Sequence, residues 1–476
     1  MSGLDRAVVA VDVGTSAVRA ALVSSGEGVL RSVRVARADD VGGATYDPDA
    51  LQSDVERAIA ALEVDARPAA LAIAAHIGAV AVDEALRPVV PAGSWSDARG
   101  VEALLRLDDV ARGELLSRAG RPTVVGGGLA LAASLVDDGC DGAVATVLGP
   151  KDLLVARLSG HVGMDLVDAA YTLALDVAHR AWSPASLEAA RVPRAWMPAL
   201  APPHAVVASL SAHAAVRCRL AEGTPIVSGS PDGSAGIGIL LGARSDAIVD
   251  VAGTTDVLGR VIGAIPEAPP GAVLNPALVA DRWVAGGATG MTGGAVARWR
   301  ALVGAVDEAA LRAVPPGAGG LHVVPGMSGT RFPRWRSDDA GAVVGQRPEH
   351  GAAEVLRAAQ EGAAHVVREG VDLLDPQRSL PVILAGGSTR SEHVVRMRAA
   401  LLGRRVLVAA DPDVTLAGAA GLALVGAGLV ADLDEARERL GIALRVVEPD
   451  SGEVDAYDRI HRSWIDVRDA IAQAAR

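Results

Sequence analysis

The sequence predicts an α/β protein of two domains that share one structural plan. Its 476 residues suffice for two or three domains of ordinary size. Apolar runs of strand length alternate with segments of helical periodicity along the chain. The opening pattern at 7–23, AVVAVDVGTSAVRAALV, recurs half a chain later at 247–262 as AIVDVAGTTDVLGRVI. We therefore expect two domains, at 1–244 and 245–476.

The first half begins with a strand, a tight Asp-Val-Gly-Thr-Ser turn and a returning strand. The stretch 183–210 is rich in Pro and Ala and predicts an irregular connection. Strands are expected at 7–11, 18–23, 70–75, 79–82 and 225–228, and helices at 49–63, 100–118, 151–159 and 234–241.

The second half repeats the plan and ends in a long uncharged segment. Residues 414–431 carry no charge and contain four glycines, which fits a small-residue helix buried in a core or, as the alternative, a short membrane span. Before it, strands are expected at 247–262 (two, around a Gly-Thr turn), 283–285, 381–385 and 405–409, helices from 294, at 351–374 and from 391, and a loop at 325–341.

Composition excludes several classes of protein. With 50% hydrophobic and 21% charged residues, the chain is neither disordered nor collagen-like. A net charge of -12 argues against a nucleic-acid partner or an anionic membrane surface. Two cysteines, Cys140 and Cys218, fit a reducing compartment, and the early charge and turn do not fit a signal peptide. We expect a cytoplasmic protein.

The two Gly-Thr turns suggest phosphate binding. A tight turn between apolar strands exposes several backbone N–H groups, which suit phosphate oxygens, and the adjacent hydroxyl adds a donor. Asp12 could hold Mg²⁺, and Arg19 on the returning strand could reach phosphate oxygens. A single turn of this kind is ordinarily structural, but its duplication favours a function. The chain has no Walker A motif, no zinc spacing and no nucleophile elbow with credible partners.

Six motifs in order resemble those of the FGGY family of carbohydrate kinases, over essentially the whole chain. They are Asp12-Val13-Gly14-Thr15-Ser16 with Arg19, Trp95-Ser96-Asp97-Ala98-Arg99, Gly229-Ser230-Pro231-Asp232-Gly233, Gly253-Thr254, Gly294 before Trp299, and Gly386-Gly387-Ser388. The resemblance implies two actin/hexokinase-like (ribonuclease H-like) domains with a central cleft, the first binding sugar and the second nucleotide. Dimers are common in the family, so it also admits a homodimer.

Carried over by position, the resemblance implies a role for each motif residue. Asp232 would be the general base and, with Asp12, would hold Mg²⁺. His76, Ile77, Trp95, Asp97 and Asp232 would face the sugar. ATP would be bound by Gly14, Thr15, Ser16, Arg19, Gly253, Thr254, Gly294, Gly386, Gly387 and Ser391.

Several positions depart from the family pattern. Xylulokinase-like members carry Gln-Met-His-Gly where this chain has Ala75-His76-Ile77-Gly78, so His76 is displaced by one residue and could be a core histidine instead. Ser391 stands where relatives often carry Asn. Asp256 would repel phosphates unless it points away or holds the metal. Asp232 itself could simply cap the following helix.

These patterns favour an ATP-dependent kinase of a sugar or polyol, with a pentulose such as xylulose as the first substrate to consider. The alternative is a relative that senses sugar or nucleotide without turnover. The altered His76 segment and Asp256 favour the alternative, whereas the intact Asp12, Asp232 and Gly-Thr turns oppose it.

Overall fold

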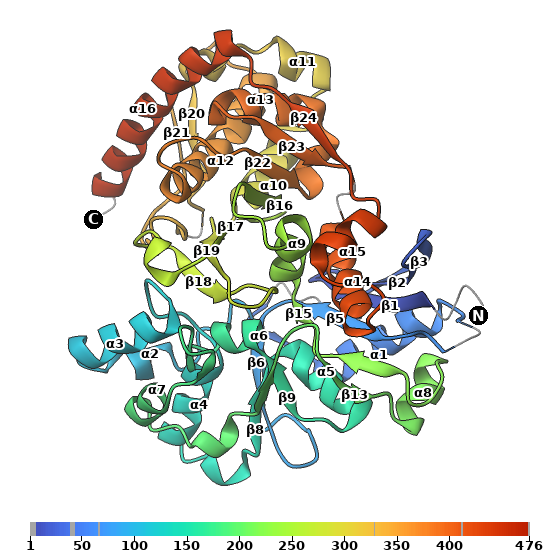
Figure 1. Ribbon diagram of the computed structural model, residues 1–476. Helices are drawn as coiled ribbons and strands as arrows, with labels where there is room; N and C mark the ends of the chain where they lie inside the picture. The colour runs from blue at the N-terminus through green and yellow to red at the C-terminus, as the bar shows by residue number, and fades with distance from the viewer. Residues whose placement is uncertain (1–5, 39–42, 65–66, 328, 411–412, 475–476) are drawn as a thin grey trace. The chain divides into compact units, whose positions relative to one another are not determined.

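The computed structural model describes residues 6–38, 43–64, 67–327, 329–410 and 413–474. The chain forms two compact units (Figure 1). Unit 1 comprises Met1–Ala243, Leu274–Trp283 and Val414–Gly441, and unit 2 comprises Arg244–Val273, Val284–Asp413 and Ile442–Arg476. Two segments of the second half of the sequence therefore belong to unit 1.

The main sheet of unit 1 is mixed. Strand β1 pairs antiparallel with β2, its neighbour along the chain, and parallel with β5 on its other side. The order is β13-β14-β5-β1-β2-β3, with β15 also paired to β5. The strands are β1 Ala7–Val13, β2 Ala17–Ser24, β3 Gly28–Ala36, β5 Leu71–Ala75, β13 Val206–Ser209, β14 Pro225–Val227 and β15 Ser230–Pro231.

A second, four-stranded sheet in the order β4-β7-β6-β8 and the helices complete unit 1. Its strands are β4 Thr45–Tyr46, β6 Gly78–Val82, β7 Ala92–Ser94 and β8 Thr146–Leu148, and two short pairs are β9 Gly163–Asp165 with β12 Ala199–Ala201 and β10 Leu175–Asp176 with β11 Ala181–Trp182. The helices are α1 Pro48–Ala60, α2 Val101–Leu105, α3 Asp109–Ala119, α4 Gly128–Asp137, α5 Pro150–Ser159, α6 Leu166–Tyr171, α7 Pro184–Ala189, α8 Ala212–Cys218, α9 Asp232–Leu241, α14 Val414–Gly426 and α15 Leu433–Arg439.

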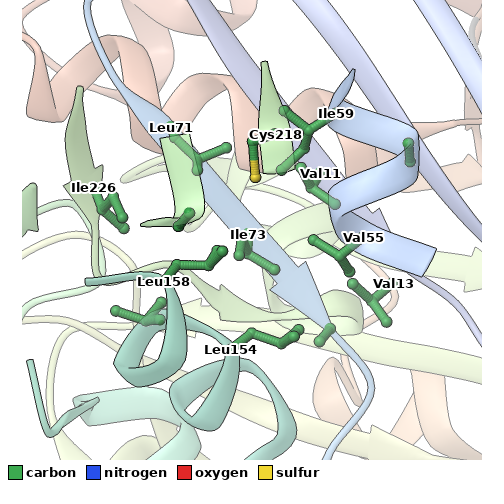
Figure 2. Close-up of a cluster of buried hydrophobic side chains, with 14 of the residues drawn as sticks. Val11, Val13, Val55, Ile59, Leu71, Ile73, Leu154, Leu158, Cys218 and Ile226 are labelled. Carbon is green, nitrogen blue, oxygen red and sulfur yellow. The ribbon is translucent and has the colours of Figure 1, made fainter. Parts of the chain in front are cut away.

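Alternate residues of β1 and β5 form the centre of the unit 1 core (Figure 2). Val11 and Ile73 pack against Val55 and Ile59 of α1 and against Leu154 and Leu158 of α5. On each helix the two side chains are four residues apart and so lie on one face. Each fully buried side chain of this size stabilises the fold by about 1.5–3 kcal/mol. Cys218 lies in the same core, and burial raises the pKa of its thiol to about 12, so it is an inert apolar residue.

The uncharged segment near the end of the chain forms helix α14, which packs against α9 inside unit 1 (Figure 1). A Cβ at Gly418 would lie 2.2 Å from the backbone oxygen of Ala235, so the two helices approach closely because residues there are small. Among the described residues, no helix combines the length and apolarity that a membrane span requires. The expectation of a buried helix is confirmed.

Unit 2 repeats the arrangement of unit 1. Strand β16 pairs antiparallel with β17 and parallel with β22, as β1 does with β2 and β5. The duplicated plan is therefore confirmed. Its strands in the order β19-β17-β16-β22-β23-β24 are β19 Trp283–Ala288, β17 Asp256–Ile262, β16 Ile248–Ala252, β22 Val382–Ala385, β23 Val406–Ala409 and β24 Leu444–Val447. Strand β18, Val273–Pro276, falls almost wholly within the unit 1 segment Leu274–Trp283. The other elements are β20 His322–Val324, β21 Ala342–Val344, α10 Thr292–Val303, α11 Glu308–Ala313, α12 Ala352–Leu374, α13 Glu392–Leu402 and α16 Ser451–Ala474.

Two expected elements differ in the structure. The helix predicted at 100–118 is two helices, α2 and α3, because Asp108 caps a new start by accepting the N–H of Ala111 at 2.8 Å. The stretch 183–210 is not irregular, because it holds α7, β12 and β13.

Candidate active site

Three sequence-predicted residues of unit 1 lie at the carboxyl ends of three adjacent parallel strands. Asp12 lies near the end of β1, opposite Ala74 of β5. His76 directly follows β5, and Asp232 directly follows β15, whose Pro231 pairs with Ala75. Because parallel strands end at the same edge of a sheet, Asp12, His76 and Asp232 lie along one edge of unit 1.

Asp12 and Arg19 form an ion pair across the first hairpin. They are register partners on β1 and β2, and Arg19 Nη2 lies 2.5 Å from Asp12 Oδ2. The Asp12 side chain is 2% exposed and the Arg19 side chain is 32% exposed, so the arginine is the solvent-accessible member of the pair. Thr15 and Ser16 are exposed in the turn between these strands. The turn thus offers hydroxyls and a guanidinium together, which is a donor set for phosphate oxygens.

Asp232 begins helix α9, and its carboxylate Oδ1 accepts the N–H of Gly233 at 2.6 Å. The N-cap of that helix is Pro231, so Asp232 does not occupy the cap position that the alternative interpretation requires. Burial raises the pKa of Asp232, while the Gly233 N–H and the charge of Arg19 lower it. The net pKa lies above that of an ordinary aspartate, which makes the carboxylate a better proton acceptor.

His76 is 3% exposed and contacts protein groups with both ring nitrogens. Nδ1 lies 3.1 Å from the carbonyl oxygen of Ile77, and Nε2 lies 3.3 Å from Arg37 Nη1. Because a guanidinium can only donate, Nε2 of the neutral ring accepts and Nδ1–H donates. The ring of Tyr46 packs edge-on at 5.3 Å between centroids. His76 is thus a buried, hydrogen-bonded histidine beside the candidate base.

The other residues expected to face the sugar share one pocket of unit 1. Ile77, Trp95 and Asp97 line it, and Trp95 is 41% exposed. Asp97 accepts hydrogen bonds from the Arg99 guanidinium at 2.6–3.0 Å, so its position is fixed. The remaining lining residues are Gly78, Ala79, Ser94, Arg99, Gly126, Gly127 and Tyr171.

In unit 2, the residues expected to bind nucleotide converge on the second Gly-Thr turn. Gly253 and Thr254 are exposed between β16 and β17. The N–H of Gly294, in the first turn of α10, donates to the Thr254 carbonyl at 2.8 Å. Gly386 follows the parallel neighbour β22, and a Cβ there would lie 2.6 Å from the Ala252 oxygen. Next to it, a Cβ on Gly387 would meet no atom of the described residues within 4 Å.

Two departures from the family pattern have structural explanations. Asp256 is fully buried and pairs with Arg398, so its carboxylate faces the interior of unit 2 rather than the turn. Ser391 is the N-cap of α13, and its hydroxyl donates to Glu308 Oε1 at 2.8 Å. The Ser391 side chain is therefore engaged within the protein.

Family models match both halves of the chain. The N-terminal domain model of the FGGY family of carbohydrate kinases matches residues 7–238, and the C-terminal domain model matches residues 249–427. The chain belongs to the FGGY family of carbohydrate kinases. The family resemblance of the six motifs is confirmed, and the protein is a carbohydrate kinase.

The FGGY proteins similar to this chain are named for different substrates. The xylulose kinase of Escherichia coli is 28% identical over 483 residues, covering 94% of this chain and 96% of that protein. Solved structures of a xylulose kinase and a gluconate kinase from Lactobacillus acidophilus each match with a TM-score of 0.88 at 20% identity, over 98% of both chains. At that identity the two structures show the shared FGGY fold and do not separate the two substrates.

Some residues around this FGGY site were not expected from the sequence. Arg37 contacts both His76 Nε2 and, at 3.4 Å, the Gly14 carbonyl. Tyr171 lines the pocket, with the Arg121 guanidinium 5.1 Å from its ring centroid. Neither belongs to a local motif, and only the folded arrangement brings them to the site.

Proposed function

We propose that this carbohydrate kinase transfers the γ-phosphoryl group of ATP to a hydroxyl group of a small sugar or polyol, with Asp232 as the general base. The observation that carries the proposal is the position of Asp232 at the sheet edge that also holds Asp12. Its raised pKa adds to this, because a more basic carboxylate takes a hydroxyl proton more readily. Xylulose, a pentulose, is the first acceptor to consider, since the similar Escherichia coli protein is a xylulose kinase.

In the proposed reaction, the acceptor hydroxyl gives its proton to the Asp232 carboxylate as its oxygen bonds to the γ-phosphorus. The bond between that phosphorus and the bridging oxygen of ADP breaks, and ADP leaves with the electron pair. Arg19 and the Thr15 hydroxyl would stabilise charge on the phosphoryl oxygens. The reaction needs no covalent enzyme intermediate, so positioning and charge neutralisation supply most of the catalysis.

The carboxylates of Asp12 and Asp232 fit a magnesium ion. Mg²⁺ takes one or two protein carboxylates together with waters and substrate phosphates, and these two carboxylates come from one sheet edge. When bound, Mg²⁺ would neutralise phosphate charge. Asp12 already pairs with Arg19, which orients its carboxylate.

In unit 2, we propose that the backbone around Gly253, Thr254, Gly294, Gly386 and Gly387 binds the nucleotide. The close approach of Gly386 to the Ala252 oxygen leaves no room for a side chain. Around the Gly387 Cβ position, the part of the chain that the structure describes leaves space for a ligand. Ser391 would border the nucleotide through its backbone, since its hydroxyl is engaged by Glu308.

The substrate pocket is proposed to lie beside Ile77, Trp95 and Asp97. His76 would support it by its hydrogen bond to the carbonyl of Ile77, which lines the pocket. The test is ATP consumption by the purified protein against pentuloses, hexuloses, polyols and aldonates. Acceptor-dependent ADP release with one class supports the proposal. Sugar binding without ADP release from any acceptor would contradict it and support the non-catalytic alternative.

A further inference from the structure

The only lysine of the chain is fully buried among three aspartates of unit 1. Lys151, in the first turn of α5, is 0% exposed. Its Nζ lies 3.1 Å from Asp165 Oδ2 and 3.3 Å from Asp168 Oδ2, and it donates to Asp152 Oδ1. One carboxylate oxygen from each of the three aspartates lies within 4.8 Å of the other two. We call these four residues the Lys151 cluster.

The Lys151 cluster keeps its lysine charged. The three carboxylates raise the pKa of Lys151 above its ordinary value despite its burial. Burial raises the pKa of Asp152 to about 6, and burial together with Asp152 raises the pKa of Asp168 well above its ordinary value. The ammonium therefore supplies the cation that a buried group of carboxylates needs.

The Lys151 ammonium also donates a hydrogen bond to a residue outside the cluster, in the segment that precedes Asp232. Lys151 Nζ donates to the carbonyl oxygen of Ser228 at 3.0 Å. Ser228 lies between β14, which ends at Val227, and β15, which begins at Ser230. Asp232 follows four residues after Ser228, so the lysine holds the backbone just where the chain passes from one strand to the next.

The packing around Gly229 shows how tightly this backbone is placed. Gly229 has φ +82°, and a Cβ there would lie 2.2 Å from the Ile73 oxygen and 2.8 Å from Lys151 Cδ. The N–H groups of Ser228 and Gly229 donate to Ala205 and Pro203 at 2.9 Å each. The lysine thus completes a set of contacts around the two residues that join the strands.

We propose that Lys151 is a positioning residue for Asp232, acting through the Ser228 carbonyl. The inference rests on the proposed role of Asp232 as general base. A charge-assisted hydrogen bond from a donor fixed by three carboxylates holds a carbonyl more firmly than a neutral donor or water would. A base displaced by about 1 Å loses on the order of a hundredfold in rate.

The test compares Lys151→Met with Asp232→Asn and with the double variant. If Lys151 acts through Asp232, Lys151→Met lowers kcat by about 10–100-fold and leaves the KM for ATP nearly unchanged. The double variant then keeps the residual rate of Asp232→Asn, because there is no base left to misplace. Arg157→Met is the matched control, since Arg157 lies on the same helix and contacts Asp49 and the Leu86 carbonyl instead.

Removing the lysine leaves buried carboxylates without a cation, so Lys151→Met could fail to fold. The variant Lys151→Met/Asp152→Asn/Asp168→Asn keeps only Asp165, which accepts the N–H groups of Val167 and Asp168. If either Lys151→Met or this triple variant folds and has the kcat of the parent protein, the inference is overturned. It is also overturned if the losses of Lys151→Met and Asp232→Asn multiply in the double variant. An active Asp232→Asn protein instead contradicts the proposed function itself.

Discussion

Arg398 Nη1 lies 2.7 Å from Oδ1 of Asp256, and both side chains are buried in unit 2. The same nitrogen lies 2.5 Å from Asp250 Oδ2, and the Thr292 hydroxyl donates to Asp256. Because of this pairing, the Asp256 carboxylate points away from the Gly253-Thr254 turn that precedes it. An aspartate at that position is therefore compatible with a bound phosphate.

Asp256→Asn should leave ATP affinity nearly unchanged. A carboxylate facing phosphates would repel them by about 1–4 kcal/mol at 4 Å, depending on exposure. Since Asp256 faces Arg398, we expect a change in ATP binding free energy well below that range by titration calorimetry. A gain in affinity of about 1 kcal/mol or more would show that the carboxylate does face the nucleotide.

Arg398→Met should destabilise unit 2 by about 3–5 kcal/mol, because it leaves the carboxylates of Asp250 and Asp256 buried without their cation. Urea unfolding measures the loss. Arg396→Met is the control on the same helix, since the Arg396 side chain is 73% exposed and pairs with Glu392 at the surface. Equal effects of the two substitutions would contradict the importance of the buried pair.

The residues predictable from the sequence are those whose role depends on a few neighbours along the chain. The two Gly-Thr turns, the Asp12–Arg19 hairpin and the segment with Asp232 are each contiguous, so strand and turn patterns locate them. Their duplication also indicates the fold, because the same strand pairings recur around β1 and β16.

The rest depends on contacts between distant segments. Arg37 meets His76 across 39 positions of sequence, and Lys151 meets Ser228 across 77. Local propensity is also overridden within 183–210, where Ala199 and its neighbours pair with Gly163–Asp165 and form a strand. No period or composition in the sequence encodes such pairings, so they could not be predicted.

Asp232→Asn should lower turnover by about 10²–10⁴-fold while ATP still binds. The amide keeps the shape and can still accept the Gly233 N–H, so helix α9 should form normally. Steady-state kinetics with the best acceptor measures the loss, and calorimetry measures ATP affinity. Asp138→Asn, at an exposed position after α4, is the control. More than about a tenth of parental turnover would exclude Asp232 as the base.

Thr15→Val and Thr254→Val should each weaken ATP binding by about 0.5–3 kcal/mol, the range for a lost hydrogen bond including one to a charged group. Both threonines are exposed in their turns, so the substitutions should cost little stability. Calorimetric titration with ATP measures each effect, and the acceptor KM serves as the internal control. Unchanged ATP affinity in both variants would contradict phosphate binding by these hydroxyls.

A buried histidine pair should make the stability of unit 2 depend on pH. Nδ1 of His365, on α12, lies 3.0 Å from Nδ1 of His461, on α16, so one ring donates and the other accepts. Burial lowers the pKa of His461 to about 4, with Arg368 adding to the effect, and burial and His461 lower the pKa of His365 well below its ordinary value. Both imidazoles are thus neutral in the folded protein near pH 6.

The unfolded chain binds a proton at His461 near pH 6.5, whereas the folded chain does so near pH 4. Stability is therefore fully present above pH 6.5 and falls as the pH drops, by on the order of 3 kcal/mol for His461 alone. His461→Gln should remove this part of the decline, which urea unfolding at pH 7.5, 6.0 and 4.5 measures. His179→Gln, at a side chain that is 80% exposed, should leave the decline intact. An equal decline in the parent protein and His461→Gln would mean that His461 is not kept neutral by folding.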